Sequence, residues 1–126
     1  MDDKKKIQSF TDLNTWREGH KLVLIVYKVT ENFPIKERFS LVDQMRRAAV
    51  SVTSNIAEGF SRQFKKEKVQ FYSTAKSSIT EIQNQLIIAR DTGYLSQDEF
   101  DKLANQPVTV SKLLSGLIRK IKSFNP

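Results

Sequence analysis

The side chains best suited to chemistry gather in one stretch of the chain, residues 46–62, with the sequence RRAAVSVTSNIAEGFSR. Its apolar residues recur at helical spacing, and polar residues follow the edge of that apolar face. Asn, Gly and Ser are weak formers of helix interiors, so a helix that accepts several of them usually places them against another element. The residues in question are Arg47, Ser51, Asn55, Glu58, Gly59 and Arg62.

Glu58 raises the question of metal-assisted hydrolysis, because it could meet Glu81 of the following helix as carboxylates do in metal-binding bundles. Such bundles also use Glu-x-x-His pairs, which this sequence lacks. Ion pairing explains Glu58 more simply, since Arg62 follows at the favourable i,i+4 spacing and Arg47 could reach it from the same face. We therefore expect no metal site, and a metal-dependent hydrolase is the lesser alternative.

The remaining sequence contains no phosphate-binding glycine loop, zinc-protease helix or Cys pair. His20 is the only His and Cys is absent, which excludes Ser-His and Cys-His nucleophiles. We expect His20 at the edge of the core or in a subunit interface. The sequence predicts no catalytic residue, no cofactor and no enzymatic activity.

Composition predicts a soluble, cytoplasmic, single-domain protein. The 126 residues suffice for one core, and no run reaches the roughly 18 apolar residues that a membrane span needs. The start, MDDKKKIQSF, has no apolar segment typical of a signal peptide, and residues 1–10 are expected to form a flexible basic arm. The formal net charge of +7 favours an anionic partner such as nucleic acid.

Hydrophobic periodicity predicts four helices, over residues 12–32, 41–60 and 65–91 and from Ser96 to the C-terminus. Short connections between them indicate an all-α, antiparallel, up-down-up-down four-helix bundle spanning residues 1–126. Helix boundaries are signalled by caps and stops at Thr11 or Asp12, Ser40, Gly59, Gly93 and the Ser96–Glu99 capping box. Pro107 should kink the last helix or split it near Asn105, and the continuous apolar pattern favours the kink.

The apolar residues are expected to form four core-facing stripes, with some left over. The stripes comprise Leu13, Trp16, Val23, Val26 and Tyr27; Met45, Ala48, Val52 and Ile56; Phe64, Phe71, Ala75, Ile79, Ile82, Leu86 and Ala89; and Phe100, Leu103, Val110, Leu114, Leu117, Ile121 and Phe124. Leu22, Ile25 and Val29, with Val42, Val50 and Ala57, are surplus to these stripes and suggest a second subunit. Phe60 is the one aromatic residue near the basic link that the core does not use.

The bundle topology concentrates positive charge at one end, where the chain starts, where the second helix meets the third, and where the chain ends. We call this set the basic end: Lys4, Lys5, Lys6, Arg62, Lys65, Lys66, Lys68, Arg119, Lys120 and Lys122. Cations near a helix C-terminus simply complement the helix dipole, which explains the last three. That explanation fails for Lys65, Lys66 and Lys68, which start a helix, so a phosphate-binding surface is favoured.

The central stretch also resembles a known family. The run QMRRAAVSVTSNIAEGFSR, preceded by FP and followed by FYSTAKSSITEIQNQL, is similar to bacterial four-helix-bundle proteins encoded in intervening sequences of 23S ribosomal RNA genes. The resemblance implies a left-handed bundle that forms a homopentamer and has no attached enzymatic activity. It extends to the accessory protein of diversity-generating retroelements, which implies nucleic acid and a reverse transcriptase as partners. Val52-Thr53 replaces the Ile-Pro pair common in the family, so the second helix should be less bent.

Two functions follow from these patterns. The first is a non-enzymatic, oligomeric protein that binds RNA, DNA or an RNA–DNA hybrid through backbone contacts with Arg62, Lys65, Lys66, Lys68, Arg119, Lys120 and Lys122. The alternative is a protein–protein scaffold whose basic end recruits an acidic partner. Under both, Arg47, Ser51, Asn55, Glu58 and Gly59 form a structural polar cluster, with Asn55 and Glu58 buried and hydrogen-bonded between helices and Gly59 permitting close approach.

Overall fold

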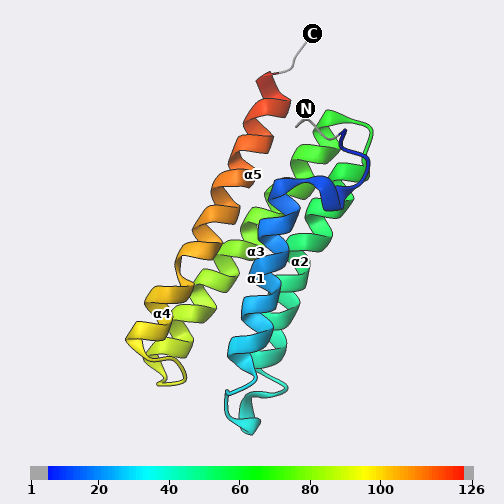
Figure 1. The fold of residues 1–126 in the computed structure, drawn as a ribbon. Helices are drawn as coiled ribbons and strands as arrows, with labels where there is room; N and C mark the ends of the chain where they lie inside the picture. The colour runs from blue at the N-terminus through cyan, green and yellow to red at the C-terminus, as the bar shows by residue number, and fades with distance from the viewer. Residues whose placement is uncertain (1–5, 124–126) are drawn as a thin grey trace.

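The computed structural model describes residues 6–123, and every regular element in that range is helical. In chain order the elements are η1 (Phe10–Asp12), α1 (Asn14–Thr30), η2 (Ile35–Glu37), α2 (Leu41–Ser61), α3 (Lys65–Asp91), α4 (Gln97–Leu103) and α5 (Asn105–Ser123). Together they form the all-α four-helix bundle that the sequence predicted, with α4 and α5 making up the fourth segment (Figure 1). No helix within residues 6–123 is both long enough and apolar enough to cross a membrane.

The helices alternate in direction along the chain and close into a ring of neighbours, because α1 packs on α2, α2 on α3, α3 on α5 and α5 back on α1 (Figure 1). The core between them is built from aliphatic side chains that are withdrawn from water, which is the main favourable contribution to folding. Its fully buried members include Leu22, Val26, Met45, Val52, Ile56, Ile79, Ile82, Val110 and Leu114. The left-handed twist stays a prediction.

The start of α1 differs from the prediction. Neither Thr11 nor Asp12 caps it, because Leu13 occupies the N-cap position and its side chain makes no capping bond. Instead Ser9 caps the short helix η1, and the Asp12 carboxylate accepts from the Ser9 backbone N–H at 3.1 Å in a reciprocal capping box. Part of the predicted arm is therefore hydrogen-bonded structure at Ser9 and Phe10, while residues 1–5 lie outside the described range.

The other boundary signals were mostly correct. Gly93 has φ +87°, a conformation that only glycine adopts without strain, and it ends α3 as predicted. Ser96 and Glu99 form the predicted capping box at the start of α4. Ser40 does occupy the N-cap of α2, but its hydroxyl donates to Glu37 Oε1 at 2.6 Å instead of capping the helix. Gly59 does not end α2, which continues to Ser61.

The last segment is split and not merely kinked. α4 ends at Leu103 and α5 begins at Asn105, with Ala104 between them. Pro107 is the third residue of α5, where its missing N–H costs nothing because the first four N–H groups of a helix have no intrahelical acceptor. The continuing apolar pattern did not distinguish a kink from a split, since two helices in line with one another can keep their apolar faces on the same side.

The core face of α1 is rotated from the predicted stripe. Its buried residues are Thr15, Gly19, Leu22, Val26 and Thr30. Leu22, expected to be surplus, is in the core, whereas Tyr27 is exposed and stacks under the Arg46 guanidinium at 4.7 Å. Ile25 and Val29 are half-buried and line a cleft of about 360 Å³ against α4.

Candidate nucleic-acid interface

The bundle topology brings the predicted basic segments to one end. The link between α2 and α3 and the C-terminal turn of α5 lie at the same end of the molecule in Figure 1. Lys65, Lys66, Arg119, Lys120 and Lys122 are all exposed there. Lys6 is exposed as well, whereas Lys4, Lys5 and Phe124 fall outside the described residues. The opposite end carries the α1–α2 and α3–α4 connections, with most of the acidic residues of the loops.

Lys68 does not have the role that the sequence suggested. Its ammonium donates to the carbonyl oxygens of Phe60 at 2.8 Å and Gly59 at 3.2 Å. These carbonyls belong to the last turn of α2, where i+4 backbone donors run out, and Gly59 O also accepts from the Arg62 N–H at 3.3 Å. Burial against this turn lowers the pKa of Lys68. Lys68 is therefore a cap that joins α3 to α2, not an exposed phosphate contact.

Arg62 is also held by protein contacts. Its guanidinium lies 3.6 Å from Glu58 Oε2 and stacks 4.7 Å from the centre of the Phe71 ring. The ion pair is the i,i+4 pair that the sequence predicted, and the side chain remains 40% exposed. Arg62 thus adds positive charge to this end but has limited freedom to reach a ligand.

A groove between α3 and α5 forms a basic concave surface near this end. It has a volume of about 510 Å³, and its lining includes Lys76, Arg119 and Lys122. Ser115, Ser123 and Ile118 complete the lining, so no carboxylate faces the groove. The three cations are therefore not neutralised by a carboxylate in the lining, which favours an anionic ligand.

Lys76 is the groove residue that sequence reasoning missed. The signal was present, because residues 68–80 contain no Asp or Glu and neither does the chain after Asp101. These two acid-free segments become neighbours only when α3 packs on α5. Lys112 precedes Arg119 by two helical turns, which places it on the same side of α5, where it is exposed.

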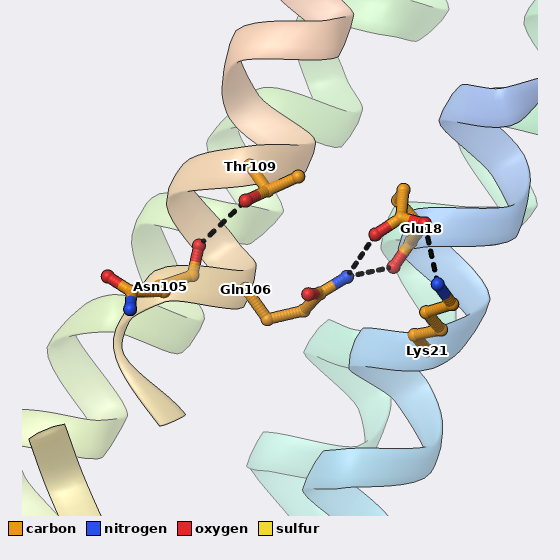
Figure 2. A network of polar contacts seen from close by, with 5 residues as sticks. All are labelled: Glu18, Lys21, Asn105, Gln106 and Thr109. Carbon is orange, nitrogen blue, oxygen red and sulfur yellow. Dashed lines mark hydrogen bonds and ion pairs between the residues drawn. The ribbon is translucent and has the colours of Figure 1, made fainter. Parts of the chain in front are cut away.

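The start of α5 is fixed to α1 by a polar network (Figure 2). Gln106 Nε2 donates to the backbone oxygen of Glu18 at 2.8 Å and to Glu18 Oε1 at 3.1 Å. Lys21 pairs with the second carboxylate oxygen at 2.9 Å. Hydrogen bonds from Lys21 and Gln106 lower the pKa of Glu18, so the carboxylate stays ionised at neutral pH.

Three aromatic residues in and around the α2–α3 link are arranged differently from the prediction. Phe64, expected in the core, is 67% exposed. Phe60, expected to be available for stacking, is half-buried and its ring lies 5.7 Å from the Lys68 ammonium. Tyr72 takes the predicted core place at the start of α3 and is buried. Phe71 and Tyr72 are adjacent on α3 and point about 100° apart, so a small change in the orientation of the helix decides which of them is buried.

The polar cluster of α2 is only partly as predicted. Glu58 is exposed and Asn55 is half-buried, so the expectation that both are buried between helices is wrong. The Asn55 amide donates within its own helix, to the Ser51 carbonyl at 2.8 Å. Ser51 and Ser78 provide the link between helices, with their hydroxyls 2.9 Å apart.

Arg47 is exposed and pairs with Asp43 at 2.9 Å, not with Glu58. Glu81 is exposed and accepts a long hydrogen bond from Gln85 at 3.4 Å. Across residues 6–123, no three His, Cys, Asp or Glu side chains converge in a way that could hold a metal ion. His20 is exposed and stacks on Trp16 with ring centres 4.8 Å apart. The polar edge of α2 therefore forms ion pairs and hydrogen bonds within the helix, and Ser51 joins it to Ser78 of α3.

Comparison with known proteins agrees with this fold. The family model described as 23S rRNA-intervening sequence protein matches residues 11–116. The chain belongs to this family. A solved structure from Bacteroides thetaiotaomicron, described as a protein of unknown function from the S23 ribosomal protein family, superimposes with a TM-score of 0.75 at 19% sequence identity. The match covers 83% of this chain and 95% of that one. No curated protein matches the sequence.

Proposed function

We propose that this family member is a non-enzymatic, cytoplasmic, oligomeric protein that binds nucleic acid through its basic end. The observation that supports the proposal most strongly is the groove of Lys76, Arg119 and Lys122 between α3 and α5, which has no acidic residue in its lining. Side chains of this kind contact phosphates, which releases bound counterions and makes affinity fall as salt rises. The ligand class is a nucleic acid backbone, as in RNA or an RNA–DNA hybrid.

Further exposed cations at the basic end extend the surface over which a phosphate chain could run. Lys120 lies on the same terminal turns of α5, and Lys65 and Lys66 lie on the first turn of α3. The far end of the bundle has cations too, but acidic residues accompany them there, among them Asp91, Asp98 and Glu99. The charge is thus polarised along the bundle, which orients an approaching polyanion toward one end.

Binding is tested by fluorescence anisotropy with labelled RNA and an RNA–DNA hybrid, over salt from about 50 to 300 mM. We expect the logarithm of the association constant to fall linearly with the logarithm of the salt concentration. The variant Lys76→Gln/Arg119→Gln/Lys122→Gln should flatten that slope by about 2, since each lost phosphate contact removes roughly 0.7–0.9. Absence of binding at the lowest salt concentration, or an association constant that does not depend on salt, would refute the proposal.

A matched control separates a specific surface from net charge alone. Lys36, Arg38 and Lys102 are exposed at the opposite end, and replacing all three by Gln changes the net charge by the same amount. The control variant should keep the wild-type slope. If it flattens the slope as much as the groove variant does, the basic end is not the binding surface.

Assembly is the second part of the proposal, and an exposed apolar strip supports it. Leu24 and Val50 are 55% and 41% exposed, and Tyr27, which lines one concave surface with Val50, is exposed as well. Val50 belongs to the surplus residues that the sequence suggested, whereas Leu22 and Val42 of that set are buried in the core. The family resemblance suggests a pentamer. Light scattering on the purified chain should give an oligomer, and Leu24→Glu/Val50→Glu should reduce it to the monomer mass. A wild-type monomer at high concentration would contradict this part.

A further inference from the structure

Phe64 is placed where neither packing nor helix capping explains a phenylalanine. It occupies the N-cap position of α3, with φ −94° and ψ 136°, and makes no side-chain capping bond. Ser, Thr, Asp or Asn at this position would satisfy a free N–H of the first turn. The ring is instead 67% exposed to water, in the middle of the basic end.

The backbone that carries this ring is firmly held. The Phe64 carbonyl accepts from the Lys68 backbone N–H at 3.0 Å, and the Lys68 side chain binds the last carbonyls of α2. The link between the two helices is only residues 62–64. Phe64 therefore lies on a short connection that hydrogen bonds hold in place. Less conformational entropy would be lost when a ligand contacts the ring.

The charges around the ring define what it could contact. Lys65 and Lys66 follow directly and are exposed, and Arg62 precedes it by two residues. The same turn carries one exposed acid, Glu67, so cations outnumber carboxylates between residues 62 and 68. An exposed aromatic ring among cations is the arrangement by which proteins bind single-stranded nucleic acid, with the ring stacking on a base and the cations contacting the backbone. A duplex offers no such base, because its bases are stacked on one another inside the helix.

We propose that Phe64 stacks on an unpaired base of a single-stranded nucleic acid while Lys65 and Lys66 contact the phosphates beside that base. The inference rests on the proposed function and makes it more specific, because it assigns the ligand to the single-stranded class. The structure also offers a matched control: Phe39, 88% exposed at the opposite end, lies next to Arg38 and two residues after the Glu37 carboxylate.

The test compares three variants, Phe64→Leu, Phe64→Tyr and Phe39→Leu, by anisotropy with a labelled single-stranded RNA and with the same sequence in a duplex. Phe64→Leu should weaken single-strand binding by about 5- to 100-fold, the range for loss of one base stack, and leave the salt slope unchanged. Phe64→Tyr should bind like the wild type because it keeps an aromatic face. Phe39→Leu should bind like the wild type, and duplex binding should not respond to any of the three.

The outcomes separate this inference from the function it rests on. Salt-dependent binding that Phe64→Leu leaves intact would overturn the stacking role alone, as would equal losses on the single strand and the duplex. A change in particle mass of Phe64→Leu by light scattering would also overturn it, since the ring would then be an interface between copies of the chain. Failure of the wild type to bind either probe would overturn the proposed function and this inference together.

Discussion

Replacing Gly59 with Ala should destabilise the bundle, although Ala is normally the better helix former. Gly59 lies inside α2 and faces α3. A Cβ at this position would lie 2.6 Å from Cε1 and 2.9 Å from Cδ1 of Tyr72, and 3.2 Å from Cβ of Phe71. Tyr72 is buried, so its ring cannot move aside without displacing other core atoms.

The magnitude follows from two opposed effects. Overpacking a well-packed site typically costs about 1–3 kcal/mol, and two ring atoms within 3.0 Å place Gly59→Ala in the upper part of that range. Ala recovers about 0.5–1 kcal/mol of helix propensity. We expect the free energy of unfolding to fall by about 1–2 kcal/mol, which lowers Tm by about 3–10 °C for a chain of this size.

Gly116→Ala is the control, because it makes the same chemical change in α5 with room for the methyl group. The one atom near its Cβ position is an Arg119 nitrogen at 4.0 Å. This variant should gain about 0.5–1 kcal/mol. Thermal unfolding followed by circular dichroism, at one protein concentration, compares the two variants with the wild type. Gly59→Ala as stable as Gly116→Ala would refute the close approach of α2 and α3.

A double-mutant cycle identifies the contact responsible. In a Tyr72→Leu background the ring is gone, so Gly59→Ala should cost much less than it does in the wild type. An unchanged cost would mean that the penalty has another source than the Tyr72 ring.

Three further predictions concern the free energy of unfolding. Gln85→Met should raise the free energy of unfolding by about 1 kcal/mol, because it removes a buried amide oxygen that has no hydrogen-bond partner within the described residues. Lys68→Met should lower it by about 1–2 kcal/mol yet leave the salt slope of nucleic-acid binding unchanged, since the ammonium caps α2. Hydrogen bonds from Ser40 and Tyr94 lower the pKa of Glu37 below its usual 4.5. These bonds therefore stabilise the folded protein above pH 4.5, and this stabilisation is lost as the pH falls through the pKa of Glu37 in the folded state. Urea unfolding at a series of acidic pH values should therefore show a smaller loss for Tyr94→Phe than for the wild type, and equal losses would contradict the role of this bond.

The sequence alone determined the features that depend on residues close together in the chain. The bounds of α3, the glycine stop at Gly93 and the capping box of Ser96 were predicted correctly, because local hydrogen bonds and backbone conformation decide them. The pattern of four helices with short connections also predicted the bundle. The bundle topology in turn placed the basic segments at one end. The i,i+4 pair of Glu58 and Arg62 follows from helix geometry in the same way.

The tertiary structure decided which face of each helix is buried. Residues 22–27 of α1 are six apolar residues in a row, so periodicity could not distinguish Leu22 in the core from Tyr27 at the surface. Packing against the neighbouring helices decided which of them is buried. Lys76 lines a groove only because α3 packs on α5, which lies about 40 residues further along the chain. Lys68 caps α2 and Phe64 is exposed because of how the short α2–α3 link sets the start of α3 against α2. A residue's type and spacing indicate which contacts it could make, and its packing partners determine which of these contacts it makes.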